Sequence, residues 1–491
     1  MHDYSKALWV ALLVTVGFVA LLTFPPDDGL RHVGLAFGPH RDWGSVYPHS
    51  VFALHGGYDP WWGYDHLLRL VARGLSALAL PPLLAPFVLM KLLSLLFMVA
   101  FVALVIRRGR LAEASRDGRG FLLALGLVLL CLTNSLMRLS LARPFGFGTL
   151  FLLYTVGTRG WLRGLLSAAA LTALYPYLAW IYTVPVALVG LWRGDRRFAL
   201  GVAAATLGGA LVQSGAFFSM QLALIRSDGL RSQFEIKIGE FTSFWTHLRF
   251  YGFFLGLALV LYPWLARREK VPAERWLLLL FLVPSVRYVR YLLDVALPLL
   301  VVSYGAEVVG LLREPLGRLA AAWKARLPRR GAPAQPEAQA QAQAQAETGA
   351  VPPAKGRSLW PVLTLLYVVA FGGASVIGLK EYVRLRHLAG DLAPVPRDAL
   401  VLTEFDAQYE LLLVRPDLRL VPSSELVFFA PAIRTEYLGF FNRGEVCPLA
   451  RRIGATFFVE RRGMYVDPQS ASCLERVPSS AALNLWRVKR R

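Results

Sequence analysis

Charged side chains are scarce in this chain: only 17% of its 491 residues are Asp, Glu, Lys or Arg, whereas 56% are hydrophobic. A soluble protein of this length rarely has so apolar a composition. Several apolar runs approach or exceed the roughly 20 residues that an α-helix needs to cross a bilayer. The sequence therefore predicts a polytopic α-helical membrane protein.

Cysteine is also rare, with three residues in the whole chain. Cys131 lies inside an apolar run, where packing explains it. Cys447 and Cys473 lie in the more polar C-terminal tail, and they can pair if that tail faces an oxidising compartment. The first apolar run, 7–24, lacks the small-residue cleavage site of a secretory signal and leads directly into polar residues. We therefore interpret it as a retained membrane span.

Acidic residues are too few to balance the basic ones, 32 against 53, and the formal net charge is +21. In a soluble protein such an excess suggests a nucleic-acid partner. Here we expect no nucleic acid, because most of the excess lies in short loops between apolar runs. These loops are 107–119, 193–197, 267–275 and 324–330. All of them fall on the cytoplasmic side if the N terminus is cytoplasmic, as the positive-inside rule requires.

The hydropathy pattern predicts about 11 transmembrane helices. The expected spans are 7–24, 84–106, 120–134, 146–158, 164–178, 180–193, 198–222, 248–266, 275–287, 291–312 and 359–379. An odd number of spans places the C-terminal tail on the side opposite to the N terminus. We therefore expect a multi-pass protein of a bacterial-type inner (cytoplasmic) membrane, with its C-terminal domain periplasmic or extracellular.

Composition divides the chain into four parts. Residues 1–323 form a transmembrane core that includes a long first outer loop, 25–82. Residues 324–358 include GAPAQPEAQAQAQAQAETGAVPPAKG, which has no apolar period, so we expect a disordered cytoplasmic linker. After the last span, 359–379, the tail 385–491 contains four strand-like stretches, DALVLTEF, LRLVPSS, ATFFVERR and LNLWRVKRR. We predict a small extracytoplasmic α/β domain there.

Two adjacent aspartates, Asp27 and Asp28, follow the first span in the stretch FPPDDGLRHVG. A carboxylate at the edge of an apolar layer can act as a general base, because partial desolvation raises its affinity for a proton. Arg31 and His32 lie close enough in the sequence to supply a cation or to orient an acceptor. A helix cap is the alternative, since Pro-Pro-Asp-Asp is a fair start for a helix.

The first outer loop also holds five of the eight histidines and a tryptophan pair, Trp61 and Trp62. The histidine spacings match no short metal-ligand motif, so we assign no metal ligands; a divalent cation between an aspartate and a phosphate is left open. The tryptophans either anchor the loop at the membrane interface or stack on a sugar. The stretch YDHLLRLVARGLSALAL predicts an interfacial helix. Its expected apolar side consists of Leu67, Leu68, Leu70 and Val71.

Arginines recur near the outer ends of later spans. Arg138 and Arg143 follow the third span, and Arg287 and Arg290 lie between the ninth and tenth. Because guanidinium binds phosphate bidentately, these four are candidate contacts for the phosphate of a lipid. Snorkelling toward membrane-lipid headgroups is the alternative for the first pair, and an ion pair with Asp294 is the alternative for Arg290.

The arrangement resembles the GT-C superfamily of integral-membrane glycosyltransferases. The likeness lies in one early span, an acidic pair in a long first outer loop, ten or so further spans, and a final soluble domain outside the cytoplasm. The resemblance implies an inverting hexosyl- or pentosyltransferase that moves a sugar from a polyprenyl-phosphate donor to a lipid, glycan or protein acceptor in cell-envelope polysaccharide synthesis. It also implies that Asp27 is the catalytic base with Asp28 in support, and that the outer arginines bind the donor phosphate. Many relatives have Asp-Glu where this chain has Asp-Asp.

Other functions stay open from the residues alone. A lipid-linked-sugar transporter or flippase predicts polar residues deep within its spans, whereas the polar chemistry of this chain lies on one side. A non-catalytic scaffold of envelope polysaccharide assembly is a further alternative, as is transfer of a preassembled glycan. In the tail, Glu404, Asp406 and Glu410 are either a solvated acidic face or part of a site.

Overall fold

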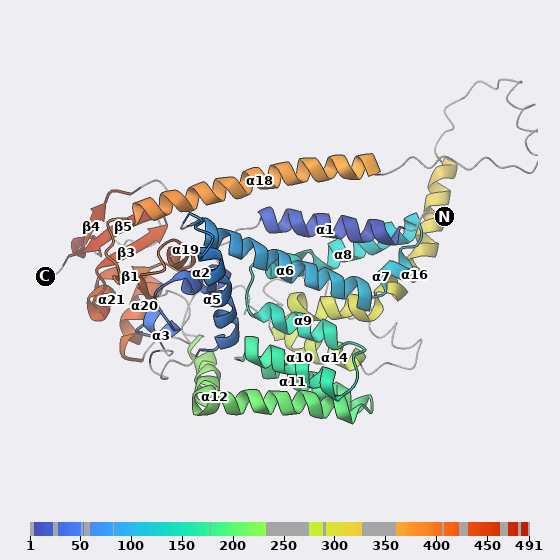
Figure 1. The fold of residues 1–491 in the computed structure, drawn as a ribbon, viewed down its shortest axis with the longest axis horizontal. Helices are drawn as coiled ribbons and strands as arrows, with labels where there is room; N and C mark the ends of the chain where they lie inside the picture. The colour runs from blue at the N-terminus through green and yellow to red at the C-terminus, as the bar shows by residue number, and fades with distance from the viewer. Residues whose placement is uncertain are drawn as a thin grey trace, which may run out of the picture.

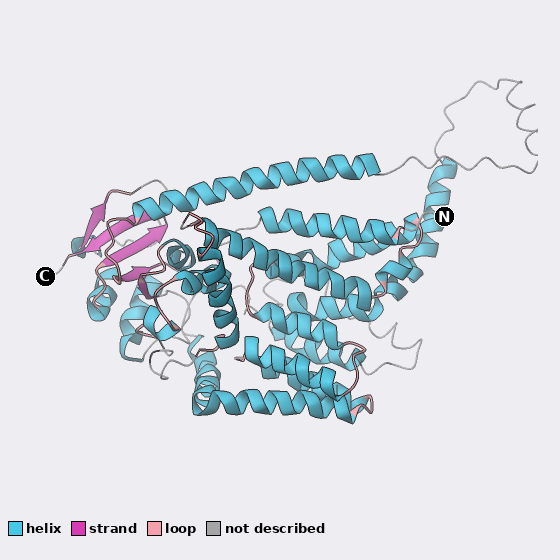
Figure 2. Cartoon of the chain, in the orientation of Figure 1, coloured by secondary structure: helices cyan, strands magenta, loops and turns pink. Residues whose placement is uncertain are grey.

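Helices that run along one common direction make up most of the molecule in the computed structural model, and a small β-sheet lies at one end of them (Figure 1). Figure 2 shows the same division into a helical body and a sheet. The structure describes residues 4–22, 28–50, 53, 59–81, 83–176, 178–231, 274–287, 291–326, 360–404, 407–421, 431–461, 470–479 and 483–489.

Three helical segments among the described residues are long and apolar enough to cross a membrane. They are α6 (Leu84–Arg108), α8 (Gly118–Leu139) and Leu292–Pro315, which joins the π-helical turn η3 (Leu292–Ala296) to the first part of α16 (Leu297–Arg326). Arg107 and Arg108 occupy the last turn of α6, where positive charge is favourable beside the helix dipole. These segments coincide with three predicted spans and fit a helical membrane protein.

The remaining predicted spans fall on other helices or outside the described residues. The shorter apolar helices are α1 (Ser5–Leu22), α9 (Phe145–Thr155), α10 (Trp161–Leu174), α11 (Ala179–Trp192) and α14 (Glu274–Arg287). Two further helices are long: α12 (Arg196–Arg231) contains the predicted span 198–222, and α18 (Trp360–Asp391) covers 360–379 of the predicted span 359–379. The predicted span 248–266 and most of the linker lie outside the described residues, so the count of eleven stays a prediction.

The two ends of the helical body differ in what they carry (Figure 1). The N terminus, the connection from α6 to α7 (Leu111–Ala114), the connection from α11 to α12 and the C-terminal end of α16 lie at one end. The sheet and the helices of the first outer loop lie at the other end. Several of the basic loops therefore share one end, as the predicted topology requires.

The tail contains a five-stranded sheet with strand order β2-β1-β3-β5-β4. The strands are β1 (Leu400–Thr403), β2 (Arg419–Val421), β3 (Phe457–Arg461), β4 (Leu474–Val477) and β5 (Leu483–Val488). β1 pairs in parallel with β2 and β3, whereas β5 is antiparallel to β3 and β4. Four of the strands lie within the four predicted stretches, which confirms those predictions, and β4 was not foreseen.

Three helices accompany the sheet: α19 (Ala407–Val414), α20 (Arg434–Arg443) and α21 (Val446–Ile453). Cys447 at the start of α21 forms a disulfide with Cys473, which lies just before β4. The sequence prediction that these two cysteines can pair is therefore confirmed. The disulfide ties one helix to the strand at the edge of the sheet.

The tail is joined to the first outer loop through α2 (Asp28–Phe37) and α19, which pack side by side. Gly34 permits this approach: a Cβ atom there would lie 2.4 Å from the carbonyl oxygen of Leu412 in α19. On the other side, Arg384 of α18 forms a bidentate ion pair with the buried Glu410 of α19, at 2.6 and 3.0 Å. Thus α19 is fixed between the last long helix and the first outer loop.

The close contact at Gly34 gives a prediction about stability. Gly34→Ala should destabilise the protein by about 1–3 kcal/mol, because the added methyl group meets backbone atoms that have to shift. The matched control is Gly74→Ala, since a Cβ atom at Gly74 meets nothing within 4 Å and alanine favours a helix. The measurement is the apparent unfolding temperature of each variant in lipid nanodiscs. Equal temperatures for the two variants would contradict the tight packing of α2 on α19.

Candidate active site

The first outer loop folds onto the sheet end of the helical body (Figure 1). Its described helices are α2, α3 (Trp43–Val46) and α5 (Trp62–Ser76). Asp42 caps α3, because its carboxylate accepts a hydrogen bond from the amide of Ser45 at 2.8 Å. Contacts between α2 and α5 close the loop into a folded unit. This unit contains most of the residues that the sequence marks as candidates.

Asp28 is the first residue of α2, where a negative charge is favourable beside the helix dipole. Its carboxylate lies 3.2 Å from Nη2 of Arg31 and 3.9 Å from Nε of Arg143, and its side chain is 23% exposed. The structure therefore brings together two of the predicted arginines with one predicted carboxylate. Asp27 lies outside the described residues.

Arg31 is almost completely buried, with 1% of its surface exposed. Its guanidinium carbon lies 5.2 Å from the ring centre of Trp43, 5.4 Å from that of Trp61 and 5.9 Å from that of Tyr409. These three aromatic faces and the carboxylate of Asp28 compensate for the loss of water around the cation. Tyr409 belongs to α19, so the tail supplies one wall of this aromatic cage, which we define as Trp43, Trp61 and Tyr409.

His32, the next predicted residue, is also buried and is held by Asp65 of α5. Nδ1 of His32 lies 2.6 Å from Oδ1 of Asp65, and Nε1 of Trp43 donates a hydrogen bond of 2.7 Å to Oδ2 of the same carboxylate. Burial, followed by the charge of Arg31, lowers the pKa of His32 from 6.5 to about 3. His32 is therefore neutral at physiological pH.

Two carboxyl groups of this cluster hold their protons unusually well. Burial raises the pKa of Asp65 from 3.8 to about 7, although its hydrogen bond from Trp43 and the charges of Arg69 and Arg31 oppose the shift. Burial and the neighbouring Asp65 raise the pKa of Asp59 to about 8. Sequence analysis did not single out either residue. The available signal was helical spacing, since Asp65 shares one face of α5 with the buried Leu68 and Ala72.

Three of the four residues on the predicted apolar side of α5 lie on its outer surface. Leu67, Leu70 and Val71 are exposed, whereas Leu68 is buried against the protein. The two tryptophans also separate: Trp61 is buried against Arg31, whereas Trp62 is half exposed. An apolar outer side that includes Trp62 is typical of a helix in a membrane interface. The interfacial position thus stays a prediction, with Leu68 on the inner side and Trp62 added to the outer one.

The remaining predicted arginines are placed differently from Arg143. Arg138 forms an ion pair with the buried Asp294 of η3, a contact between helices that lie far apart in the sequence. Arg138 and Arg143 both lie against the ring of Phe145. Arg287 ends α14, but its side chain is not described, and Arg290 lies outside the described residues.

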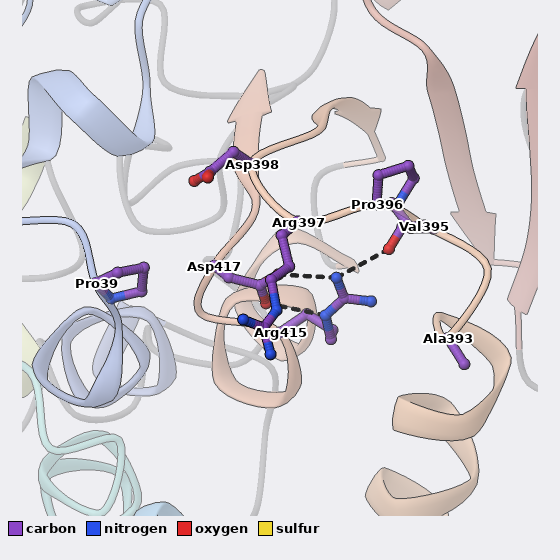
Figure 3. A pocket seen from close by; sticks show the side chains of 8 residues that line it. All are labelled: Pro39, Ala393, Val395, Pro396, Arg397, Asp398, Arg415 and Asp417. Carbon is purple, nitrogen blue, oxygen red and sulfur yellow. Dashed lines mark hydrogen bonds and ion pairs between the residues drawn. The ribbon is translucent and has the colours of Figure 1, made fainter.

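A pocket of about 780 Å³ lies beyond the other end of α2 (Figure 3). Arg415 shapes one wall, because its guanidinium binds Asp417 and donates to the carbonyl oxygens of Leu392 and Val395. The other lining residues are Pro39, Ala393, Pro396, Arg397 and Asp398. With ten residues in α2, the pocket lies about 15 Å from Asp28 along the helix. It is therefore separate from the carboxylate site.

The structure tests two of the three acidic residues of the tail. Glu404 and Glu410 are buried, so the interpretation of these two as a solvated acidic face is wrong, and Asp406 lies outside the described residues.

Within the described part of the chain, no three His, Cys, Asp or Glu side chains come together as a metal site. Asp27 and His55 are not covered by that statement.

The raised carboxyl pKa values predict how stability depends on pH. Folded Asp59 and Asp65 bind protons more tightly than the unfolded chain, so the free energy of unfolding falls as pH rises from about 4 to about 8. His32 acts in the opposite direction, but only between about pH 3 and 6.5. Above pH 6.5 the two carboxyl groups still lower the free energy of unfolding as pH rises, and His32 no longer opposes this effect.

We therefore expect the apparent unfolding temperature to fall by roughly 2–4 °C between about pH 6.5 and 8.5. Asp59→Asn should reduce this fall, because the amide has no proton to lose. Glu314→Gln, at an exposed carboxylate, is the control and should leave the fall unchanged. The measurement is thermal unfolding in lipid nanodiscs across this pH range. An unfolding temperature that rises with pH in the wild type would contradict the prediction.

Comparisons with known proteins do not assign a family. No protein-family model matches the chain, and no curated protein matches its sequence. Function has to be inferred from the side chains themselves: a partly exposed carboxylate between two guanidinium groups, beside a buried cluster of aromatic and acidic residues.

Proposed function

We propose that this chain is a membrane glycosyltransferase that moves a sugar from a polyprenyl-phosphate donor to an acceptor on the outer face of the cytoplasmic membrane. The observation that carries the proposal is the partly exposed carboxylate of Asp28, with Arg31 at 3.2 Å and Arg143 at 3.9 Å. A base and cations are the two things that sugar transfer from a phosphate requires. The resemblance to GT-C glycosyltransferases supports the same assignment.

The reaction is a displacement at the anomeric carbon. Asp28 takes the proton of an acceptor hydroxyl, and the acceptor oxygen forms a bond to the anomeric carbon. The bond from that carbon to the phosphate oxygen breaks, and the phosphate leaves with the electron pair. Because the acceptor attacks from the face opposite to the phosphate, the configuration at the anomeric carbon is inverted. Asp27, the base that the resemblance to GT-C enzymes implies, lies outside the described residues and stays a candidate for the same role.

Of the two described arginines beside Asp28, Arg143 suits the donor phosphate better. Arg31 is enclosed by the aromatic cage and has almost no exposed surface, so it serves to hold Asp28. Arg143 retains some exposure and contacts Asp28 only at 3.9 Å. Guanidinium forms strong charge-assisted hydrogen bonds with phosphate, so Arg143 can stabilise the departing carrier phosphate.

The membrane setting fits a lipid-linked donor. Asp28 opens the helix that follows α1, a predicted span, and three described helical segments are able to cross a bilayer. The exposed apolar residues of α5 lie on the same loop unit as Asp28. We infer that the polyprenyl chain approaches through the membrane interface beside this unit.

The central test is sugar transfer to water or to an acceptor by the full-length protein in lipid nanodiscs. The donors are polyprenyl phosphates that carry glucose, mannose, galactose or arabinose. Asp28→Asn should lower the turnover rate by about 10²–10⁴-fold, because a general base contributes that much, while the donor is still bound. Asp27→Asn is measured beside it, and Glu314→Gln is the control. Wild-type turnover in both aspartate variants would contradict the catalytic base.

Arg143 provides a separate prediction. Arg143→Gln should raise the KM for the donor and also lower kcat, because the cation contacts a phosphate whose charge grows as the bond breaks. Arg143→Lys should change KM and kcat less than Arg143→Gln does, since lysine keeps the charge but loses the bidentate geometry. The comparison uses steady-state kinetics with the same donor. An unchanged KM in Arg143→Gln would exclude the assigned role.

If the protein moves intact donor across the bilayer without cleaving it, the transporter alternative holds instead.

A further inference from the structure

One buried carboxylate joins three segments of the first outer loop. Asp65 of α5 contacts Nδ1 of His32 in α2 at 2.6 Å and accepts the indole hydrogen bond of Trp43 in α3 at 2.7 Å. Asp65 itself is only 1% exposed. A carboxyl group with two hydrogen-bond partners at such short distances fixes both rings in orientation as well as in position.

His32 turns its other ring nitrogen toward the protein interior. Among the described residues Nε2 of His32 has no hydrogen-bond partner, and the ring is enclosed by Trp43, Trp61 and Tyr64 at centre distances of 5.0 to 5.2 Å. A base that acts on an acceptor needs access to it. This nitrogen is buried behind aromatic rings, so His32 suits a role that works through its neighbours.

One of the two rings that Asp65 orients, that of Trp43, is also part of the aromatic cage around Arg31. Trp43 forms one face of the aromatic cage, and His32 packs edge-on against both Trp43 and Trp61. Arg31 in turn contacts Asp28 at 3.2 Å. A continuous series of contacts therefore leads from Asp65 through the aromatic rings to the guanidinium of Arg31 and the partly exposed carboxylate of Asp28.

We propose that Asp65 is a positioning residue of the transfer site, which fixes His32 and Trp43 so that the aromatic cage holds Arg31 against Asp28. The expected effect on catalysis rests on the proposed function, but the contacts that lead from Asp65 to Asp28 can be tested without any substrate. Asp65 does not touch the reacting atoms. Its loss should change the rate of transfer without changing how the donor phosphate is bound.

The substrate-free test is ¹⁵N NMR of the full-length protein with labelled histidine in lipid nanodiscs at about pH 8. At this pH Asp65 is mostly ionised, so the His32 proton should reside on Nδ1, and Nε2 should be bare. His32→Asn assigns the signals. His32 and Trp43 contact different oxygens of Asp65, and Asp65→Asn replaces one of these oxygens with an NH2 group that can only donate, so the single tautomer should be lost. A His32 tautomer that Asp65→Asn leaves unchanged would overturn the proposal.

The kinetic test uses donor turnover in the same nanodiscs. Asp65→Asn should lower kcat by about 10- to 100-fold with little change in the KM for the donor, as expected when a reacting group is slightly misplaced. Trp43→Phe, which keeps a ring but loses the hydrogen bond, should have a smaller effect in the same direction. His66→Asn, on the exposed side of α5, is the matched control and should behave as the wild type.

His32→Asn separates positioning from direct chemistry. The asparagine amide retains an N–H donor toward Asp65 but has no counterpart of Nε2, so it should keep most of the activity that His32→Leu loses. If His32→Asn is as slow as Asp28→Asn, His32 takes part in the chemistry itself, and the positioning role is overturned. Full kcat in Asp65→Asn would also overturn it while leaving the proposed function intact. If the wild type turns over no donor, the proposed function fails, and the NMR result still decides whether Asp65 fixes His32.

Discussion

The burial of one cation, the guanidinium of Arg31, is the constraint on which the site depends. An ion of this kind loses several kcal/mol of hydration when it leaves water, so it needs a partner in every direction. Asp28 supplies the opposite charge, and Trp43, Trp61 and Tyr409 supply aromatic faces. These partners come from separate segments of the chain. The cation is therefore satisfied only when the first outer loop and the tail are both in place.

This requirement explains why the tail packs as closely as it does. Glycine at position 34 lets the backbone of α19 approach α2, and the pair of Arg384 with Glu410 holds α19 against the end of α18. Any movement of α19 away from α2 would remove Tyr409 from the aromatic cage and admit water beside Arg31. The tail is thus part of the site as well as a neighbour of it, although Asp28 itself belongs to the first loop.

Local patterns predicted the features that depend on neighbours in sequence, and missed those that depend on the fold. Short strand-like stretches in the tail placed four of the strands, and the acidic pair after the first span marked Asp28. Asp294 shows the limit: helical spacing points only to partners within a turn of the same helix, and the pair with Arg138 of another helix could not be foreseen. Asp65 shows it too, because a charged residue among leucines is normally assigned to the solvent side. Only the fold reveals that its partners are His32 and Trp43.

The unusual polarity of α5 fits the predicted position of the first outer loop at the membrane interface. In water a helix buries leucine and exposes aspartate, but a helix beside a bilayer can turn apolar residues outward without penalty. Its inner side is then available for a dry polar network, in which charges interact more strongly than they do in water. Such a network has to be nearly neutral, and neutral His32 and the raised pKa values of Asp59 and Asp65 serve that end. Asp28 and Arg143 remain its partly exposed members, which is where an anionic lipid headgroup can enter without breaking the buried contacts.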